Sequence, residues 1–178
     1  MHIITGQNGY LLSHLLPYVP LEGYCYHFGC PIDSHSSRNR ALLEKHINDT
    51  KDIIKKCRKF NLKMIYASSM TTAAPCNDTQ YKITKILVES MLDPTQDLIW
   101  RIPRILSLDR KRGLLETLRS GKMYNPNNTV EFVHINDFRD AFVKSLNDVG
   151  VYYYKGPAYR SKIKDVIPLL ESIESNMS

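Results

Sequence analysis

The residues best suited to chemistry lie in the segment Tyr81-Lys82-Ile83-Thr84-Lys85. Tyr81 and Lys85 are four positions apart, so on a helix their side chains share one face and can meet. An ammonium beside a phenol favours the phenolate, which can accept or return a proton near neutral pH. Ser69 lies at the carboxyl end of the preceding predicted strand, two residues after Ala67, and can hydrogen-bond the same substrate oxygen. These three residues form the candidate catalytic group. The spacing alone also fits a surface Tyr/Lys pair on an amphipathic helix.

Two glycines form a second candidate site. Gly6 and Gly9 directly follow a short apolar strand and precede a predicted helix. Glycine permits a tight turn there and lets backbone N–H groups approach a pyrophosphate. Leu12 stands where dinucleotide sites usually have a third glycine, so the helix is expected to pack differently. The turn therefore predicts phosphate binding, with a purely structural strand-to-helix turn as the alternative.

Strands and helices alternate along almost the whole sequence. Predicted strands cover residues 2–5, 24–28, 62–67, 98–102, 131–135 and 151–154, and predicted helices cover 10–16, 38–59, 80–92, 114–119, 137–146 and 163–173. Such alternation indicates right-handed βαβ units and a parallel sheet covered on both faces. We therefore predict an α/β fold, a reduced Rossmann-like doubly wound sheet, with residues 1–178 forming a single domain.

Composition and charge exclude several other classes of protein. With 43% hydrophobic and 24% charged residues among 178, the chain is neither disordered nor fibrous. No apolar run approaches the roughly 20 residues of a membrane span. The net charge of +6 favours anionic ligands. The basic run at 55–59 ends a predicted helix, where cations complement the dipole, and no nucleic-acid-binding module is present, so a nucleic-acid partner is not favoured.

The cysteines and the N-terminus indicate a cellular compartment. Cys25, Cys30, Cys57 and Cys76 match no zinc site and no disulfide framework, which is typical of reduced thiols. The first ten residues contain no signal-type segment. We therefore expect a cytoplasmic protein without a metal site.

Six segments, in order, resemble one known family. The chain is similar to the extended short-chain dehydrogenase/reductases, in particular the NAD-dependent epimerase/dehydratase family. The matching segments are Ile4–Leu11 (ITGQNGYL), His27–Pro31 (HFGCP), Tyr66–Ser69 (YASS), Tyr81–Glu89 (YKITKILVE), Arg101–Arg104 (RIPR) and Phe132–Asp137 (FVHIND).

This resemblance implies roles for individual residues. Tyr81 is the implied acid/base, Lys85 its activator and ribose ligand, and Ser69 the partner of the substrate hydroxyl. The implied cofactor is NAD or NADP, and the implied substrate is a nucleotide sugar or a small molecule carrying a hydroxyl. Residues from about 104 to 178 would contribute the substrate-side portion. The implied cofactor contacts are Gly6, Gln7, Asn8, Gly9, Tyr10, Leu11, Gly29, Cys30, Ala67, Lys85 and Arg101.

The sequence also departs from the family. Only 17 residues, 10 to 26, separate Gly9 from His27, so the two strands that carry the adenosine half of the site are expected to be missing. The acidic ribose ligand expected about 20 positions after the glycines is missing with them, and Asp33 is a weak stand-in. The first strand then becomes a sheet edge, which needs a covering segment or invites another chain, including a second copy. Met70 and Thr71 replace the Asp-Glu pair of the sugar dehydratases, which argues against dehydration.

Two hypotheses about function follow. The first is a minimal oxidoreductase or epimerase, an isomerase-type activity included, that uses NAD(P) on a hydroxyl group through Ser69, Tyr81 and Lys85. The second is a catalytically idle relative that binds a nucleotide or a partner protein through the remaining site. His27 and His134 are interpreted as satisfied core histidines.

Overall fold

The computed structural model of the chain describes residues 1–29, 40–73, 80–111, 113–121 and 125–177. It contains two compact units. The first comprises residues 1–102 and 142–154, and the second comprises residues 103–141 and 155–178. Helix α5 (Ile135–Lys144) passes from the second unit back into the first. That the whole chain acts as one domain stays a prediction.

The first unit is built on a five-stranded sheet in which all paired strands are parallel. The strand order is β1-β2-β3-β4-β7, so β1 lies at an edge among the described strands, as the short spacing between Gly9 and His27 predicts. The parallel Rossmann-like arrangement is thereby confirmed. Its strands are β1 (Ile3–Thr5), β2 (Tyr24–His27), β3 (Lys63–Ser69), β4 (Leu98–Ile102) and β7 (Gly150–Tyr153).

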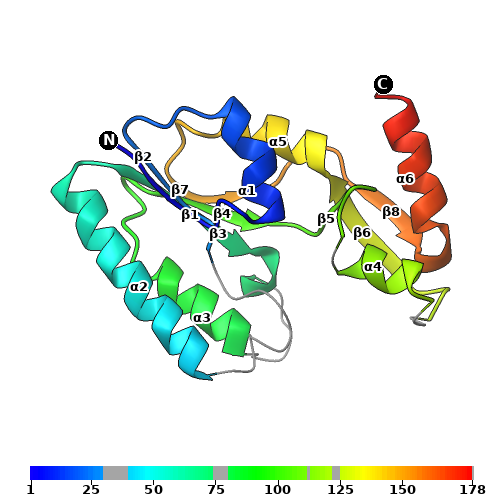
Figure 1. Cartoon of the computed structure of the whole chain (residues 1–178), viewed down its shortest axis with the longest axis horizontal. Helices are drawn as coiled ribbons and strands as arrows, with labels where there is room; N and C mark the ends of the chain where they lie inside the picture. Colours follow the sequence, from blue (N-terminus) through cyan, green and yellow to red (C-terminus); the bar gives the residue numbers. More distant parts are fainter. Residues whose placement is uncertain (30–39, 74–79, 112, 122–124, 178) are drawn as a thin grey trace. The chain divides into compact units, whose positions relative to one another are not determined.

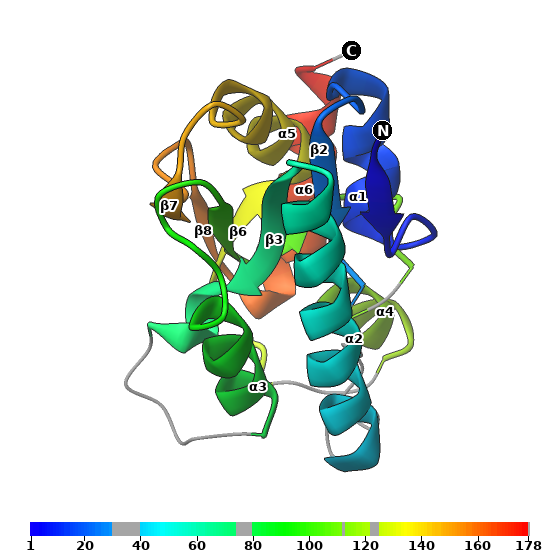
Figure 2. The same cartoon turned by 90° about the vertical axis from the view of Figure 1, so that its left-hand side faces the viewer.

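Helices cover both faces of this sheet (Figure 1). Helices α2 (Arg40–Lys59) and α3 (Gln80–Glu89) lie side by side on one face (Figures 1 and 2). Helix α1 (Tyr10–Leu15) lies on the opposite face and continues into the 3₁₀ turn η1 (Leu16–Tyr18), where Pro17 prevents further helix. The turn η3 (Met70–Thr72) follows β3 directly.

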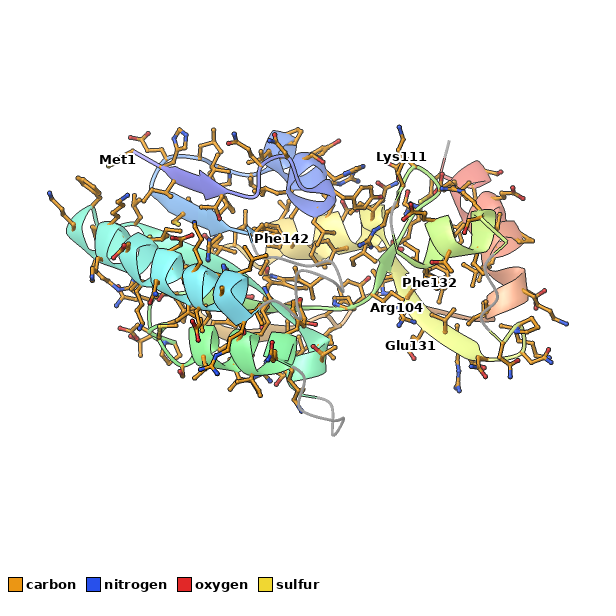
Figure 3. All side chains as sticks on the ribbon, turned by 60° about the horizontal axis from the view of Figure 1, so that its bottom comes forward. Met1, Arg104, Lys111, Glu131, Phe132 and Phe142 are labelled. Atoms are coloured by element: carbon orange, nitrogen blue, oxygen red, sulfur yellow. The ribbon has the colours of Figure 1, made fainter. Side chains whose placement is uncertain are left out.

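Successive side chains of the strands point to opposite faces of the sheet, so buried residues form a core layer on each face. On the α2 and α3 side, Cys57 and Val88 pack against strand residues such as Met64. On the other side, Phe142 packs against Phe28 and Trp100, with ring centroids 5.8 and 5.7 Å apart. Figure 3 labels Phe142 on α5. The thiols of Cys25 and Cys57 are free and buried, whereas Cys30 and Cys76 lie outside the described residues.

The second unit has its own small sheet, with the order β5-β6-β8. Strand β6 pairs parallel to β5 and antiparallel to β8. Phe132 of β6 is buried in this unit's core, whereas its neighbour Glu131 is exposed on the other face of the strand (Figure 3). Its elements are β5 (Ile105–Leu106), α4 (Leu114–Arg119), β6 (Thr129–His134), β8 (Tyr159–Lys162), the turn η4 (Ile163–Asp165) and α6 (Val166–Ser175).

Three of these elements differ from the sequence-based prediction. Strands β5 and β8 are not predicted, because a two-residue strand and an antiparallel return strand depend on pairing with β6 rather than on their own sequence. The last helix begins at Val166, not Ile163. Pro168 therefore lies in the first helical turn, where a backbone N–H has no partner within the helix.

No described helix is long and apolar enough to cross a membrane.

Candidate active site

Lys85 is a buried cation at the centre of the candidate site. Its side chain is 3% exposed, and Nζ donates a hydrogen bond to the carbonyl oxygen of Ala67, 2.5 Å away. The ammonium also lies 4.7 Å from the ring centroid of Tyr66 and 5.7 Å from that of Tyr81. Burying a charge is costly unless polar groups compensate it. Here a carbonyl dipole and two aromatic faces hold the charge in place.

The i, i+4 spacing of Tyr81 and Lys85 has the predicted consequence. Both side chains lie on one face of α3 and meet, with Tyr81 half-buried and Lys85 buried. Because Ala67 belongs to β3, the hydrogen bond from Lys85 ties this face of α3 to the carboxyl end of that strand. In open α/β sheets, ligands bind beyond these strand ends.

Ser69 is the last residue of β3, two positions after Ala67. Its Oγ accepts hydrogen bonds from Thr71 Oγ1 at 2.9 Å and from the Thr71 backbone N–H at 3.3 Å. A hydroxyl has two acceptor lone pairs and one donor hydrogen, so both acceptor positions of Ser69 are engaged. Toward a substrate oxygen, Ser69 therefore acts as a hydrogen-bond donor.

The Gly6–Gly9 turn is closed by a hydrogen bond between its two glycines and packs against the backbone that follows β2. Gly9 N donates to Gly6 O at 2.8 Å. Gly6 has a φ of +76°, and a Cβ there would lie 2.7 Å from the backbone N of Gly29. Glycine is therefore required at position 6 by the protein's own backbone, independently of any ligand. Gln7 and Asn8 are exposed in the turn, and Gly29 contacts Thr5 as well as Gly6.

We expect Gly6→Ala to destabilise the protein more than Gly23→Ala. Both glycines have positive φ values, +76° and +82°, but a Cβ at Gly23 would meet no atom within 4 Å. Gly23→Ala therefore adds only backbone strain, on the order of 1 kcal/mol, whereas Gly6→Ala adds a backbone clash. Urea unfolding of the two variants measures the difference. Equal losses would show that Gly29 simply moves away.

The remaining residues of the first helix serve the core. Leu12 is fully buried, which places the residue in the third-glycine position inside the hydrophobic interior. Leu11 is half-buried, and the ring of Tyr10 packs against His14 in a tilted arrangement, with ring centroids 4.4 Å apart. Whether Tyr10 and Leu11 contact a cofactor stays a prediction, and Cys30 lies outside the described residues.

Arg101 is engaged in an ion pair. Its Nη2 and Nε donate to the carboxylate of Glu89 at 2.6 and 3.1 Å, and Nη1 donates to the hydroxyl of Tyr153. Ser68 also donates to Glu89. This network links β3, α3, β4 and β7. It accounts for Arg101 structurally, while a contact with the cofactor stays a prediction.

A polar cluster beside Lys85 contains residues that the sequence analysis did not single out together. His27 is 2% exposed, and its ring stacks between His46 and Tyr66, with centroids 5.4 and 5.6 Å away. His46 and Thr50 of α2 are 5% and 0% exposed. The available signal was their i, i+4 spacing in line with Leu43, which puts polar residues at core positions of an amphipathic helix.

The two buried imidazoles are held neutral. Burial lowers the pKa of His27 to about 3, assisted by His46 and by Lys85 and opposed by Asp49. Burial lowers the pKa of His46 to about 4, again assisted by Lys85 and opposed by Asp49. The unfolded chain, in which histidine titrates near 6.5, therefore binds protons that the folded protein does not bind.

We expect stability to fall as the pH drops from about 6.5 toward about 4. Each imidazole contributes up to about 1.4 kcal/mol per pH unit in that window, and its full contribution is retained above it. Urea unfolding at pH 7.5, 5.5 and 4.5 measures the slope. His27→Gln should reduce the slope by about half, because His46 still contributes, and His2→Gln, at an exposed position, should leave it unchanged. Parallel slopes for His27→Gln and the unaltered protein would contradict the assignment.

His134 is a satisfied core histidine of the second unit, as predicted. It is 2% exposed, and its Nε2 lies 3.3 Å from Glu174 Oε1. Its Nδ1 accepts from the backbone N of Asn136 at 3.3 Å. Leu108 N donates to the same Glu174 oxygen at 2.7 Å, so the histidine is part of the bond network between α6 and β6.

Comparisons with known proteins address the fold. No model of a known family and no curated protein matches the chain. A hypothetical dTDP-4-dehydrorhamnose reductase from Sulfolobus tokodaii matches 97% of this chain over 82% of its own, with 13% identity and a TM-score of 0.72. UDP-glucuronic acid 4-epimerase from Bacillus cereus, solved with NAD, aligns with 98% of this chain and over 84% of its own length, with 18% identity and a TM-score of 0.64.

A third solved structure of similar fold is that of a dehydrogenase. L-threonine dehydrogenase from Phytophthora infestans matches 100% of this chain over 83% of its own, with 12% identity and a TM-score of 0.71. At such identities the likeness concerns the fold alone. The predicted resemblance is confirmed at that level: the chain has the Rossmann-type fold of solved reductase, epimerase and dehydratase structures.

Proposed function

We propose that the protein is an NAD(P)-dependent oxidoreductase or epimerase that acts on a hydroxyl of a nucleotide sugar or a small molecule. The observation that carries the proposal is the buried ammonium of Lys85 against the ring of Tyr81, at the carboxyl end of β3. A structural surface pair would leave the ammonium in water. The solved structures of similar fold include a hypothetical dTDP-4-dehydrorhamnose reductase and a UDP-glucuronic acid 4-epimerase, whose names are those of nucleotide-sugar enzymes.

Each residue has a distinct task in this proposal. Tyr81 exchanges a proton with the substrate hydroxyl, and Lys85 stabilises the phenolate electrostatically. Ser69 donates a hydrogen bond to the same oxygen, because its acceptor positions are occupied by Thr71. Met70 and Thr71 provide no carboxylate, so the proposal does not include dehydration.

The residues present fit one half of a dinucleotide better than the other. Ser69 ends β3, and Lys85, beside Tyr81, is hydrogen-bonded to Ala67 of the same strand; these residues would hold the nicotinamide half, which would supply the hydride acceptor or donor. At the glycine end, Gly6 to Gly9 form an exposed turn, but no described strand flanks β1 on its outer side. Three lost hydrogen bonds to the adenosine ribose, at roughly 0.5–1.5 kcal/mol each, weaken affinity about ten- to a thousandfold.

We expect NADH to bind with a dissociation constant of about 0.1 to 10 mM, instead of the micromolar range of a complete site. Titrations with NADH and NADPH, followed by ligand fluorescence and by calorimetry, measure it. Tyr18→Phe, at an exposed position, is the control. Flat curves for both nucleotides up to 10 mM would remove the enzymatic proposal.

The edge position of β1 favours a second candidate function, a binding module without turnover. An edge strand, which β1 is among the described strands, can present backbone groups to another chain. Turnover distinguishes the two functions. The enzyme oxidises or epimerises a member of a panel of UDP- and dTDP-sugars, whereas the binding module retains nucleotide or partner affinity and leaves every panel member unchanged.

A further inference from the structure

A continuous hydrogen-bonded chain connects the glycine turn to helix α2 through the interior of the first unit. The backbone N of Gly29 donates to Thr5 Oγ1 at 3.2 Å, and Thr5 Oγ1 lies 2.6 Å from His27 Nδ1. On the other side of the ring, His27 Nε2 lies 2.8 Å from Thr50 Oγ1, which donates to the carbonyl of His46 at 2.7 Å.

The donor and the acceptor of each hydrogen bond in this series can be assigned by starting from Thr50. Thr50 donates its only hydroxyl hydrogen to the His46 carbonyl, so its Oγ1 can only accept a hydrogen bond from His27. His27 must then carry its proton on Nε2. A neutral imidazole has one N–H, and burial keeps this ring neutral, so Nδ1 is an acceptor and Thr5 donates to it.

At the Thr5 end, this series of hydrogen bonds holds the Gly6–Gly9 turn in place. Thr5 is the last residue of β1 and directly precedes Gly6. Its Oγ1 fixes Gly29, the residue against whose backbone Gly6 packs so closely that no Cβ fits. The registers Thr5↔His27 and His27↔Tyr66 place the ring of His27 in one row across three strands, beside the Lys85 ammonium over Tyr66.

We infer that His27 is a positioning residue: through Thr5 and Gly29 it fixes the shape of the Gly6–Gly9 turn, and Thr50 of α2 fixes His27. The turn that is proposed to meet the dinucleotide is thus linked to helix α2 through Thr5, His27 and Thr50. The ligand-binding consequence rests on the proposed function, whereas the mechanical consequence does not.

Removing one hydroxyl at a time tests this chain. Thr5→Val and Thr50→Val keep the side-chain shape and each delete one bond partner of His27. Hydrogen exchange of the amides in residues 3–12 should quicken about tenfold in both variants, because each removes one hydrogen-bond partner of His27. The double variant should exchange no faster than either single variant, because one break already opens the chain.

Thr84→Val is the matched control. Thr84 is also buried, and its hydroxyl donates to a carbonyl of its own helix, Gln80 O, at 2.7 Å. It should leave exchange at residues 3–12 unchanged. A merely structural role for Thr50 would speed exchange in α2 alone. That outcome, or additive effects in the double variant, would overturn the inference.

Nucleotide titration of the same variants adds the functional readout. The dissociation constant for NADH should rise by about the same factor in Thr5→Val and Thr50→Val, and stay unchanged in Thr84→Val. If the unaltered protein binds no NADH, the proposed function fails while the exchange data still decide on His27. If NADH binds and the exchange effects are absent, the inference fails and the proposed function stands.

Discussion

Tyr81→Phe is expected to reduce turnover at least about 100-fold, since removal of a positioned acid/base typically costs two to four orders of magnitude. The substitution keeps the ring that faces the Lys85 ammonium at 5.7 Å, so the buried charge retains its aromatic partner. NADH affinity should therefore change by less than about threefold, and the unfolding midpoint by little. The assay follows NADH absorbance with the most active member of the nucleotide-sugar panel.

The control for this prediction is Tyr18→Phe, the same chemical change at a position that is 55% exposed. It should leave turnover unchanged. Full activity of Tyr81→Phe with intact nucleotide binding would show that the phenol is not the proton carrier. The α3 pair would then be a structural support for β3.

The largest effect on stability is expected at Asp97. This carboxylate is fully buried and accepts hydrogen bonds from both Nη atoms of Arg58, from Met64 N at 3.3 Å and from Asp93 N at 3.0 Å. It therefore ties the end of α2 to β3 and to the segment before β4. Asp97→Asn replaces an acceptor oxygen by a donor and leaves the Arg58 charge uncompensated.

We expect Asp97→Asn to lower the free energy of unfolding by about 3 kcal/mol, the low end for a broken buried pair because Arg58 is 31% exposed. For a chain of this size that corresponds to a midpoint roughly 6–12 °C lower. Asp52→Asn breaks the exposed pair with Lys55 and should cost less than about 1 kcal/mol. Similar losses in the two variants would contradict a buried role for Asp97. Thermal unfolding followed by circular dichroism gives both values.

The candidate site divides into a predictable part and a part that depends on packing. The i, i+4 spacing of Tyr81 and Lys85 predicts their meeting because helical geometry is local. The burial of the Lys85 ammonium under Tyr66 and Ala67 O depends on where α3 lies against β3, which no local pattern specifies. Likewise, the ion pair between Arg101 and Glu89 forms because α3 packs against β3, which pairs with β4.

By itself, the sequence determined the order and type of most elements, the parallel sheet, and the edge position of β1 among the described strands. Periodicity and chain length between elements encode these features locally. Only the tertiary structure decided the small sheet with its antiparallel strand β8, the contact that makes Gly6 indispensable, and the neutral His27 between Thr5 and Thr50. These depend on residues far apart in the chain whose approach is fixed by the packing of the whole unit, and such approach leaves no periodic trace in a single sequence.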